Sequence, residues 1–240
     1  MMSVFYDFHM HTCLSPCGGG DMTPANLAGM ANLCGLNAIA AADHNTCLNC
    51  PAVLRRAEEN GILAIPAMEL TTSEEAHVLC LLPDLKAAAE FSDYVYSKLP
   101  DIPNKPGIFG EQLIVDGNDQ VVGEEKKFLL AAADISVYEV SELLKTYGGA
   151  AIPAHIDRSS FSVLSNLGVW DALWGFTAYE QYDRSLNLTQ KHPGLKPLNR
   201  IFNSDAHRLE DIRDAENTME LKTMSAKSVI NRLTEISVIC

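Results

Sequence analysis

The segment at residues 7–12 (DFHMHT) constrains the fold of this chain most, because it alternates polar and apolar side chains directly after an apolar start. We predict that it ends a first β-strand. Side chains on a strand point to opposite faces with period two, so Asp7, His9 and His11 are expected to share one face. Two neighbouring imidazoles can hold one cation through nitrogen, and Asp7 is placed to orient one of the rings. An isolated H-x-H pair is common, so the pair alone does not establish a metal site.

Helical and strand-like segments alternate along the rest of the chain. Helices are predicted at residues 24–33, 52–60, 84–99, 136–147, 159–167, 182–189 and 225–236. Strands are predicted at residues 36–42, 62–68, 77–82, 150–154, 173–179, 200–203 and 218–221. Such alternation favours an α/β protein with a parallel sheet or barrel.

Residues 101–128 interrupt this alternation. Two short apolar runs at residues 112–115 and 120–122 flank the turn sequence Asp116-Gly117-Asn118, which predicts a β-hairpin. The segment is too small to carry its own core, so we interpret it as an insertion rather than a second domain. It could cover a functional site or lie at the periphery.

Length and charge limit the classes of partner. The chain has 240 residues, 47% of them hydrophobic, and a net charge of −13. We find no apolar run long enough to span a membrane and no secretory signal, and we therefore expect a cytoplasmic protein. An acidic protein does not attract anionic lipid or a long nucleic acid, although bound metals could still recruit a small phosphorylated substrate. The sequence leaves the oligomeric state open.

Metal-binding side chains recur where the predicted strands end. They are His9, His11, Asp43, His44, Glu69, His77, His155, Asp205 and His207, which include six of the seven histidines. In a parallel α/β protein the carboxyl ends of the strands meet at one face, where sites form. Each residue alone could be a buried, hydrogen-bonded side chain or a helix cap. Together they exceed what one ion needs, and two or three ions bridged by Glu69 would use them all.

The order of these motifs resembles the PHP (polymerase and histidinol phosphatase) family. The resemblance rests on H-x-H-T at 9–12, D-H-N at 43–45, Glu69, His77, A-H-I-D at 154–157 and S-D-A-H at 204–207. It implies a distorted (β/α)7 barrel that forms a single domain over residues 1–240. It also implies a metal-dependent phosphoesterase, often with three ions. The metal, whether zinc, manganese or iron, is not specified.

The resemblance also implies three sets of ligands. His9, His11, Glu69 and Asp205 would hold one ion; Glu69, His77 and His155 would hold a second; His44 and His207 would help to hold a third. One position departs from the family pattern, because Pro16 stands where an Asp is usual and Cys17 where some members have His. Cys17 or Asp21 could substitute, and a thiolate suits zinc or iron.

A metal-activated water would then attack the phosphorus of a small phosphorylated metabolite or nucleotide. Asp205 or His207 could assist proton transfer. Arg158 or Arg184 could clamp a phosphate, or each could be a surface side chain. Two other functions stay open. One is a non-catalytic module that binds a partner. The other is an amidohydrolase-like metal-dependent hydrolase, although the lysine-type group that usually bridges the metals is missing and Glu69 stands in its place.

The seven cysteines do not predict a disulfide framework in a cytoplasmic protein. Cys34 and Cys80 lie in apolar contexts and are expected in the core. Another group of four, Cys13, Cys17, Cys47 and Cys50, would lie at one end if the first two strands are neighbours. They could bind zinc or an iron–sulfur cluster, or be free, oxidisable thiols.

Overall fold

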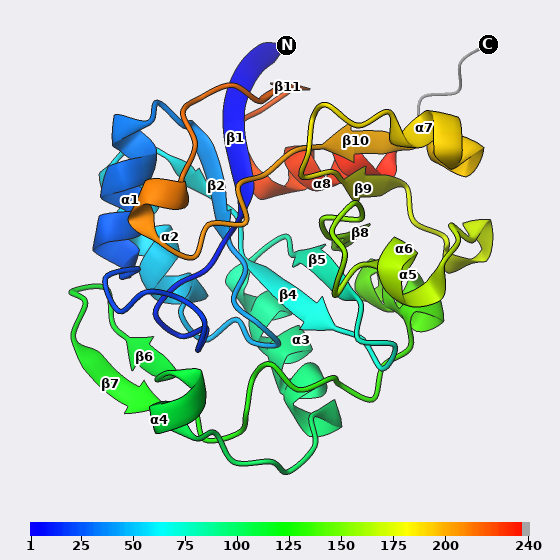
Figure 1. Cartoon of the computed structure of the whole chain (residues 1–240). Coiled ribbons are helices and arrows are strands. Elements are labelled where there is room, and N and C mark those ends of the chain that lie inside the picture. Colours follow the sequence, from blue (N-terminus) through cyan, green and yellow to red (C-terminus); the bar gives the residue numbers. More distant parts are fainter. Residues whose placement is uncertain (237–240) are drawn as a thin grey trace.

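The computed structural model describes residues 1–236, with strands at the centre and helices around them (Figure 1). The strands are β1 (Met2–Met10), β2 (Ala38–Ala41), β3 (Leu63–Ala64), β4 (Ala67–Thr71), β5 (His77–Leu81), β6 (Leu113–Val115), β7 (Val121–Glu124), β8 (Ala150–Pro153), β9 (Ala178–Glu180), β10 (Asn199–Ile201) and β11 (Thr218–Leu221). The α-helices are α1 (Pro24–Leu33), α2 (Cys50–Glu59), α3 (Leu85–Lys98), α4 (Pro106–Phe109), α5 (Val137–Thr146), α6 (Val163–Leu167), α7 (Leu188–Lys191) and α8 (Ala226–Thr234). Short 3-10 helices are η1 (Ala172–Trp174), η2 (Pro193–Leu195) and η3 (Leu209–Asp211). The predicted α/β class is confirmed.

Local sequence signals explain where several helices begin. The hydroxyl of Thr23 accepts a hydrogen bond from the N–H of Asn26 at the start of α1, and Pro24 occupies the first turn. At α5, Ser136 and Glu139 form a capping box. These caps hold the helices at the positions that the sequence predicts.

The sheets are only partly parallel. Strands β1, β2 and β3 are parallel, with β11 added antiparallel to β1, and β9 and β10 are parallel. In contrast, β4, β5 and β8 form an antiparallel sheet. The predicted parallel arrangement is therefore present in only part of the structure. A tight turn, closed by a hydrogen bond from the Thr72 N–H to the Ala76 carbonyl, joins β4 to β5 and is too short for a crossover.

Backbone hydrogen bonds near the strand ends connect one sheet to the next. They run from Glu69 N to Asp43 O (3.0 Å), Asn45 N to Glu69 O (2.9 Å), Ala154 N to His77 O (3.0 Å), Ile156 N to Glu180 O (3.0 Å), Gln181 N to Ile201 O (2.9 Å) and His11 N to Ala206 O (2.9 Å). Many of the bonded residues are predicted site residues or their neighbours. The strand ends therefore converge on one region of the molecule.

Strand β1 divides the apolar core from this polar region. Val4, Tyr6 and Phe8 are buried in an apolar cluster with residues of β2, β8, β10 and α8. Asp7 and His9 alternate with them and are also buried. The predicted alternation is only partly correct, because the pairing of β1 with β2 shifts register between Asp7 and Met10, and Met10 packs in a different apolar cluster from Phe8.

Three predicted elements differ in the structure. The strand predicted at 62–68 is divided by Pro66 into β3, which pairs with β2, and β4, which pairs with β5. The strand predicted at 173–179 is η1 followed by β9, with the chain turning at Gly175 (φ +71°) between them. Of the helix predicted at 182–189, only the last two residues are helical, as the start of α7. The carboxylate of Asp157 binds the N–H groups of Tyr182 and Asp183 and holds the first residues in another conformation.

The predicted hairpin is present as β6 and β7. It packs on the loop after β1: the Leu113 N–H donates to the Cys13 carbonyl, and Asn49 bridges to Leu113 and Val115. Within the part of the chain that the structure describes, no residue of 101–128 lines the cavity at the histidine cluster. In residues 1–236 no helix combines the length and the apolar character needed to cross a lipid bilayer.

Candidate metal centre

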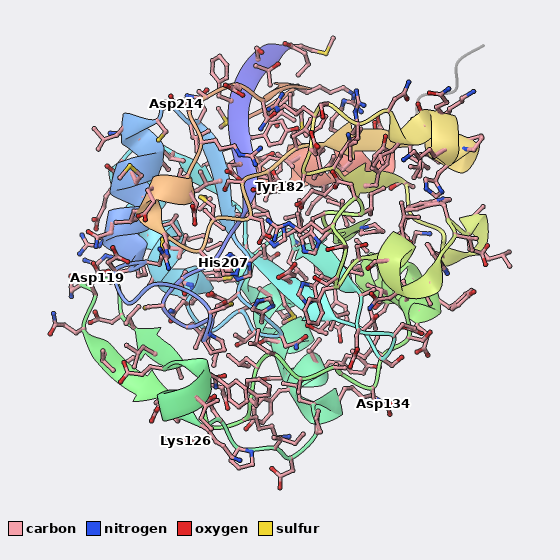
Figure 2. The ribbon with its side chains drawn as sticks, viewed as in Figure 1. Asp119, Lys126, Asp134, Tyr182, His207 and Asp214 are labelled. Atoms are coloured by element: carbon pink, nitrogen blue, oxygen red, sulfur yellow. The ribbon has the colours of Figure 1, made fainter. Side chains whose placement is uncertain are left out.

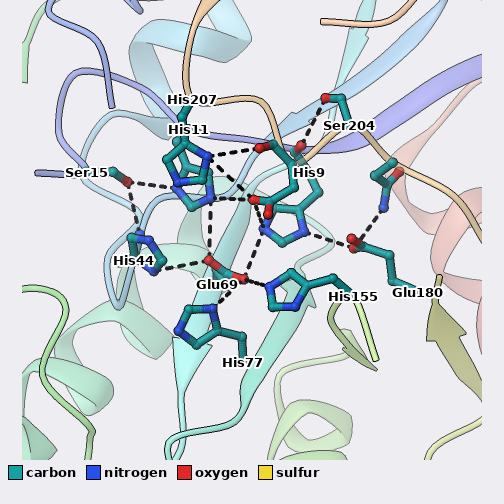
Figure 3. A network of polar contacts seen from close by, with 12 residues as sticks. His9, His11, Ser15, His44, Glu69, His77, His155, Glu180, Ser204 and His207 are labelled. Atoms are coloured by element: carbon teal, nitrogen blue, oxygen red, sulfur yellow. Dashed lines mark hydrogen bonds and ion pairs between the residues drawn. The ribbon is translucent and has the colours of Figure 1, made fainter. Parts of the chain in front are cut away.

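The six predicted histidines lie together with Glu69 and Asp205 (Figure 3), whereas the carboxylate of Asp43 binds Thr12 and Ser15. All of them are buried except His207, which is partly exposed. The imidazole rings are close to one another, with ring centres 4.1 Å apart for His11 and His207 and 4.6 Å apart for His11 and His44. Such a concentration of buried polar groups needs compensating partners or ions.

The carboxylate of Glu69 is at the centre of the cluster. Its Oε1 lies 2.9 Å from His77 Nδ1, 3.1 Å from His155 Nε2 and 3.2 Å from His9 Nε2, and its Oε2 lies 3.1 Å from His44 Nδ1 and 3.4 Å from His11 Nε2. Burial alone would raise the pKa of Glu69, but the surrounding imidazoles hold this pKa well below its usual range. The side chain is therefore an ionised bridge between several ligands.

Three overlapping groups of side chains bring one ligand atom each within 4.8 Å of one another. They are His9, His11, Glu69 and Asp205; His44, Glu69 and His77; and His11, His44 and His207. The first group is the first set that the sequence predicts. The second group contains His44 in place of the predicted His155. His155 contacts Glu69 but is not a member of this group. The third joins His44 and His207, as predicted, and adds His11.

Unpaired nitrogen atoms show that the donor set fits metal ions. His9 Nε2 and His44 Nδ1 are buried and face oxygens of Glu69 at 3.2 Å and 3.1 Å, yet neither makes a hydrogen bond with acceptable geometry. Buried polar atoms are rarely left without a partner in native proteins. The imidazole nitrogens and carboxylate oxygens are of the types that bind zinc, manganese or iron.

The backbone is strained at two of these positions. His155 and Asp205 have φ values of +29° and +52°, which non-glycine residues seldom adopt. Both follow a strand and turn sharply where their side chains join the cluster. Burial alone would raise the pKa of Asp205, but His9 and His11 lower this pKa below its usual range. The pKa of His207 is lowered to about 4, first by burial and then by His11, so its ring is neutral near pH 7.

A cavity of about 230 Å³ opens onto the cluster. Its wall includes His77, His155, Asp205 and His207 on the polar side, and Leu130 and Phe161 on the apolar side. The ring of Phe161 stacks on His77 with centres 4.9 Å apart and is 47% exposed. The cavity is therefore small and lined partly by polar and partly by apolar side chains, and such a cavity suits a small ligand.

No family model matches the sequence, and neither does any curated protein sequence. Solved structures do match. The lesion-specific endonuclease Q of Pyrococcus furiosus superposes with a TM-score of 0.73 at 18% identity, covering 97% of this chain and 56% of that one. Endonuclease Q bound to a 27-mer duplex with an abasic lesion gives 0.72 at 18% identity, with 96% and 56% covered. This chain thus spans about half the length of endonuclease Q.

Two further structures match over nearly their whole length. A protein of Bifidobacterium adolescentis named as a metal-dependent phosphoesterase gives a TM-score of 0.57 at 18% identity, with 98% of this chain and 97% of that one covered. An amidohydrolase of Chromobacterium violaceum with bound sulfate gives 0.57 at 17% identity, with 92% and 93% covered. The chain has a PHP-like fold. At these identities the likeness is one of fold.

Arg158 lies beside the histidine cluster, and Arg184 does not. The Nη1 of Arg158 is 3.0 Å from Asp205 Oδ2, and its side chain lines the cavity. Arg184 instead stacks on Phe202 and contacts Asn217 and Glu216, outside this cavity. The interpretation of Arg184 as a phosphate clamp has no support in this geometry.

The substitute ligands predicted for the third ion lie outside the donor groups. Cys17 is at the cavity mouth, but no group of metal-ligating atoms within residues 1–236 includes it or Asp21. Desolvation, followed by the charges of Glu69 and Asp205, raises the pKa of the Cys17 thiol to about 12.

The predicted site of four cysteines has no support among residues 1–236. Cys47 and Cys50 each donate to the carbonyl of Ala67, whereas Cys13 contacts the carbonyl of Leu113. In the described part of the chain no cysteine joins a group of potential metal ligands, and these cysteines are free thiols. Cys80 is buried as expected, but Cys34 is partly exposed, contrary to the prediction.

Sequence reasoning missed the residues that hold the ligand rings. Glu180 Oε2 lies 2.9 Å from His9 Nδ1, and the hydroxyl of Ser15 lies 2.9 Å from His11 Nδ1. Asp7 was expected to orient an imidazole, but its carboxylate binds the N–H groups of His9 and Ser204 instead. Glu180 carried a recognisable signal, because it is a carboxylate at the end of a short buried strand.

We expect Glu180→Gln to weaken metal binding about 10-fold to 100-fold, because the hydrogen bond that fixes the His9 ring loses its charge. Competition with a chelating dye would measure the affinity. Glu220→Gln, at an exposed position, is the matched control. Equal affinities in the two variants would contradict a supporting role for Glu180.

Proposed function

We propose that this chain is a metal-dependent phosphoesterase that hydrolyses a small phosphorylated metabolite or nucleotide. We further propose that residues 1–240 form one domain, a distorted (β/α)7 barrel with the hairpin inserted at about 101–128. The hydrogen bonds that connect successive strand ends around the site support the barrel. Residues 237–240, which follow the last predicted helix, lie outside the described residues.

The observation that carries the function is the mostly buried donor set around Glu69, with its unpaired imidazole nitrogens. We assign one ion to His9, His11, Glu69 and Asp205. A second belongs to Glu69, His77 and either His155 or His44, and a third to His11, His44 and His207. Zinc, manganese or iron ions bound there would supply a nucleophilic water and neutralise charge on phosphoryl oxygens.

The chain's own residues would position the phosphoryl group. Arg158 uses one nitrogen on Asp205 and retains other N–H groups that can reach a phosphoryl oxygen. His207 Nδ1 bonds to the backbone carbonyl of Asp205 at 2.9 Å, which leaves Nε2 to bind an ion or to transfer a proton. The apolar wall at Leu130 and Phe161 would receive the rest of the substrate.

Two other functions use the same fold. A non-catalytic binding module would have no need to keep so many buried histidines and carboxylates, which are costly without ions. An amidohydrolase is compatible with the fold matched in Chromobacterium violaceum. A guanidinium group beside the donors favours a phosphoester over an amide.

A nucleic-acid substrate is the second candidate, because endonuclease Q, bound to DNA in one matched structure, has the same fold. The net charge of −13 opposes a long polyanion, since it offers no general attraction to phosphates. A short single strand would meet less repulsion than a duplex. The experiment below includes both.

The test is hydrolysis of a panel of phosphate monoesters, nucleoside bisphosphates and oligonucleotides in the presence of manganese or zinc. His9→Ala is the inactive variant, and His192→Ala, the one histidine outside the cluster, is its control. Activity that is lost with chelator and with His9→Ala, but kept with His192→Ala, supports the proposal. Bound metal without release of phosphate or shortened product would overturn it, and amide substrates would then be tried.

Chelation is also expected to destabilise the protein. An ion at 100 times its Kd contributes about 2.7 kcal/mol to the free energy of unfolding, which corresponds to about 5–11 °C in Tm for a chain of this size. Differential scanning calorimetry with and without chelator measures the shift. In His9→Ala the shift should be much smaller, and an equal shift would place the ions elsewhere.

A further inference from the structure

A second cavity of about 430 Å³ adjoins the metal centre. It shares Arg158, Asp205 and His207 with the first cavity, and its own wall includes Tyr182 and Arg213. Figure 2 shows Tyr182 in the central region of the molecule together with His207. A molecule whose reacting group sits at the ions can therefore extend past Arg158 into this space.

Two guanidinium groups lie on the ring of Tyr182. The carbon at the centre of the Arg158 guanidinium is 4.2 Å from the ring centre, and that of Arg213 is 4.8 Å from it. Stacking of this kind holds a guanidinium plane while leaving its N–H groups free to donate. Both cationic groups thus stack on Tyr182, and Arg158 lies between the two cavities.

Backbone hydrogen bonds hold Tyr182 in place. The carboxylate of Asp157 accepts hydrogen bonds from the N–H groups of Tyr182 (2.8 Å) and Asp183 (2.7 Å). The residue next to Arg213, Ile212, is buried in an apolar cluster with residues of α1 and β2. Tyr182, Arg158 and Arg213 are therefore fixed by segments distant from one another in the sequence.

Arg213 has no partner for its charge. Among residues 1–236 it makes neither an ion pair nor a hydrogen bond through its side chain, although the chain carries 31 acidic residues. Glu210 and Asp211 also line the cavity, but both are exposed, and Glu210 lies 3.9 Å from Arg208. A partly buried, unpaired guanidinium facing a cavity is suited to an anion.

We propose that Arg213, supported by Tyr182, binds a second phosphate of the substrate, so that the preferred substrate is a small bisphosphate. This rests on the proposed phosphoesterase function. The phosphate that is hydrolysed sits at the ions, Arg158 lies between the two groups, and the second phosphate occupies the adjoining cavity. The exposed carboxylates of Glu210 and Asp211 oppose a longer polyanion, which favours a small molecule over a nucleic-acid strand.

The test compares matched substrates in the metal-loaded protein. Fructose 6-phosphate is paired with fructose 1,6-bisphosphate, and adenosine 5′-monophosphate with adenosine 3′,5′-bisphosphate. The variants are Arg213→Ala and Arg213→Lys. The control is Arg200→Ala, because Arg200 also stacks on an aromatic ring, Phe202, but lines neither cavity.

We expect Arg213→Ala to lower kcat/KM for a bisphosphate about 10-fold to 100-fold, with little change for its monophosphate. Arg213→Lys should recover part of the loss, and Arg200→Ala should leave the preference unchanged. Equal losses for both members of each pair would overturn the proposal. A loss confined to oligonucleotide cleavage would also overturn it, because the second phosphate would then belong to a strand.

Calorimetric titration with the bisphosphates separates failure of this proposal from failure of the proposed function. It needs no turnover, so a protein that hydrolyses no ester can still bind a bisphosphate more tightly than the monophosphate. Tighter binding that disappears in Arg213→Ala would support the second phosphate site alone. Equal binding of both members of each pair would reject it, whatever the reaction proves to be.

Discussion

Replacing Glu69 with glutamine is expected to lower kcat/KM for the best phosphoester about 10³-fold or more. Glutamine keeps the shape of the side chain but removes the charge that His9, His44 and His77 face at 2.9–3.2 Å. Bound ions supply several kcal/mol of transition-state stabilisation, and each 1.36 kcal/mol is about tenfold in rate. Because Glu69 contributes to two of the donor groups, its replacement should affect more than one ion.

The measurement combines steady-state kinetics with metal analysis of the same preparation. Glu58→Gln is the control, since Glu58 is exposed on α2 and far from the donor groups. We expect Glu69→Gln to retain fewer ions per chain, and Glu58→Gln to match the wild type in both properties. Full metal content with normal kinetics in Glu69→Gln would remove Glu69 from the centre of the site.

Replacing Phe8 with alanine is expected to lower the free energy of unfolding by about 3–5 kcal/mol. Phe8 is fully buried on β1, directly before His9, and stacks on Tyr6 with ring centres 4.6 Å apart. The loss is large against a total stability of about 5–15 kcal/mol. It arises from the apolar face of β1, whereas the donor side chains remain intact.

Urea unfolding with chelator present measures this loss without a contribution from bound metal. Phe5→Ala is the matched control on the same strand, because Phe5 is 37% exposed and should cost much less. If the two variants unfold at the same urea concentration, the inner face of β1 does not carry the stability that we assign to it. A metal titration of Phe8→Ala would then show whether the alternation still positions His9.

The sequence by itself determined the donor set and its order. His9, Glu69 and Asp205 were recognisable because each follows an apolar segment. Helix starts at Thr23 and Ser136 were also readable, since caps depend on residues only three positions apart. These features depend on residues close together in the sequence, so they can be recognised without knowledge of the fold.

Only the tertiary structure decided which distant segments meet. The antiparallel pairing of β5 with β8 joins strands separated by α3, the hairpin and α5, and no local pattern specifies that pairing. Likewise, Glu180 reaches the ring of His9 across 171 positions, and Arg213 reaches Tyr182 from beyond β10. The left-handed backbone at His155 and Asp205 also depends on its surroundings, because strain of this kind persists only where neighbouring contacts enforce it.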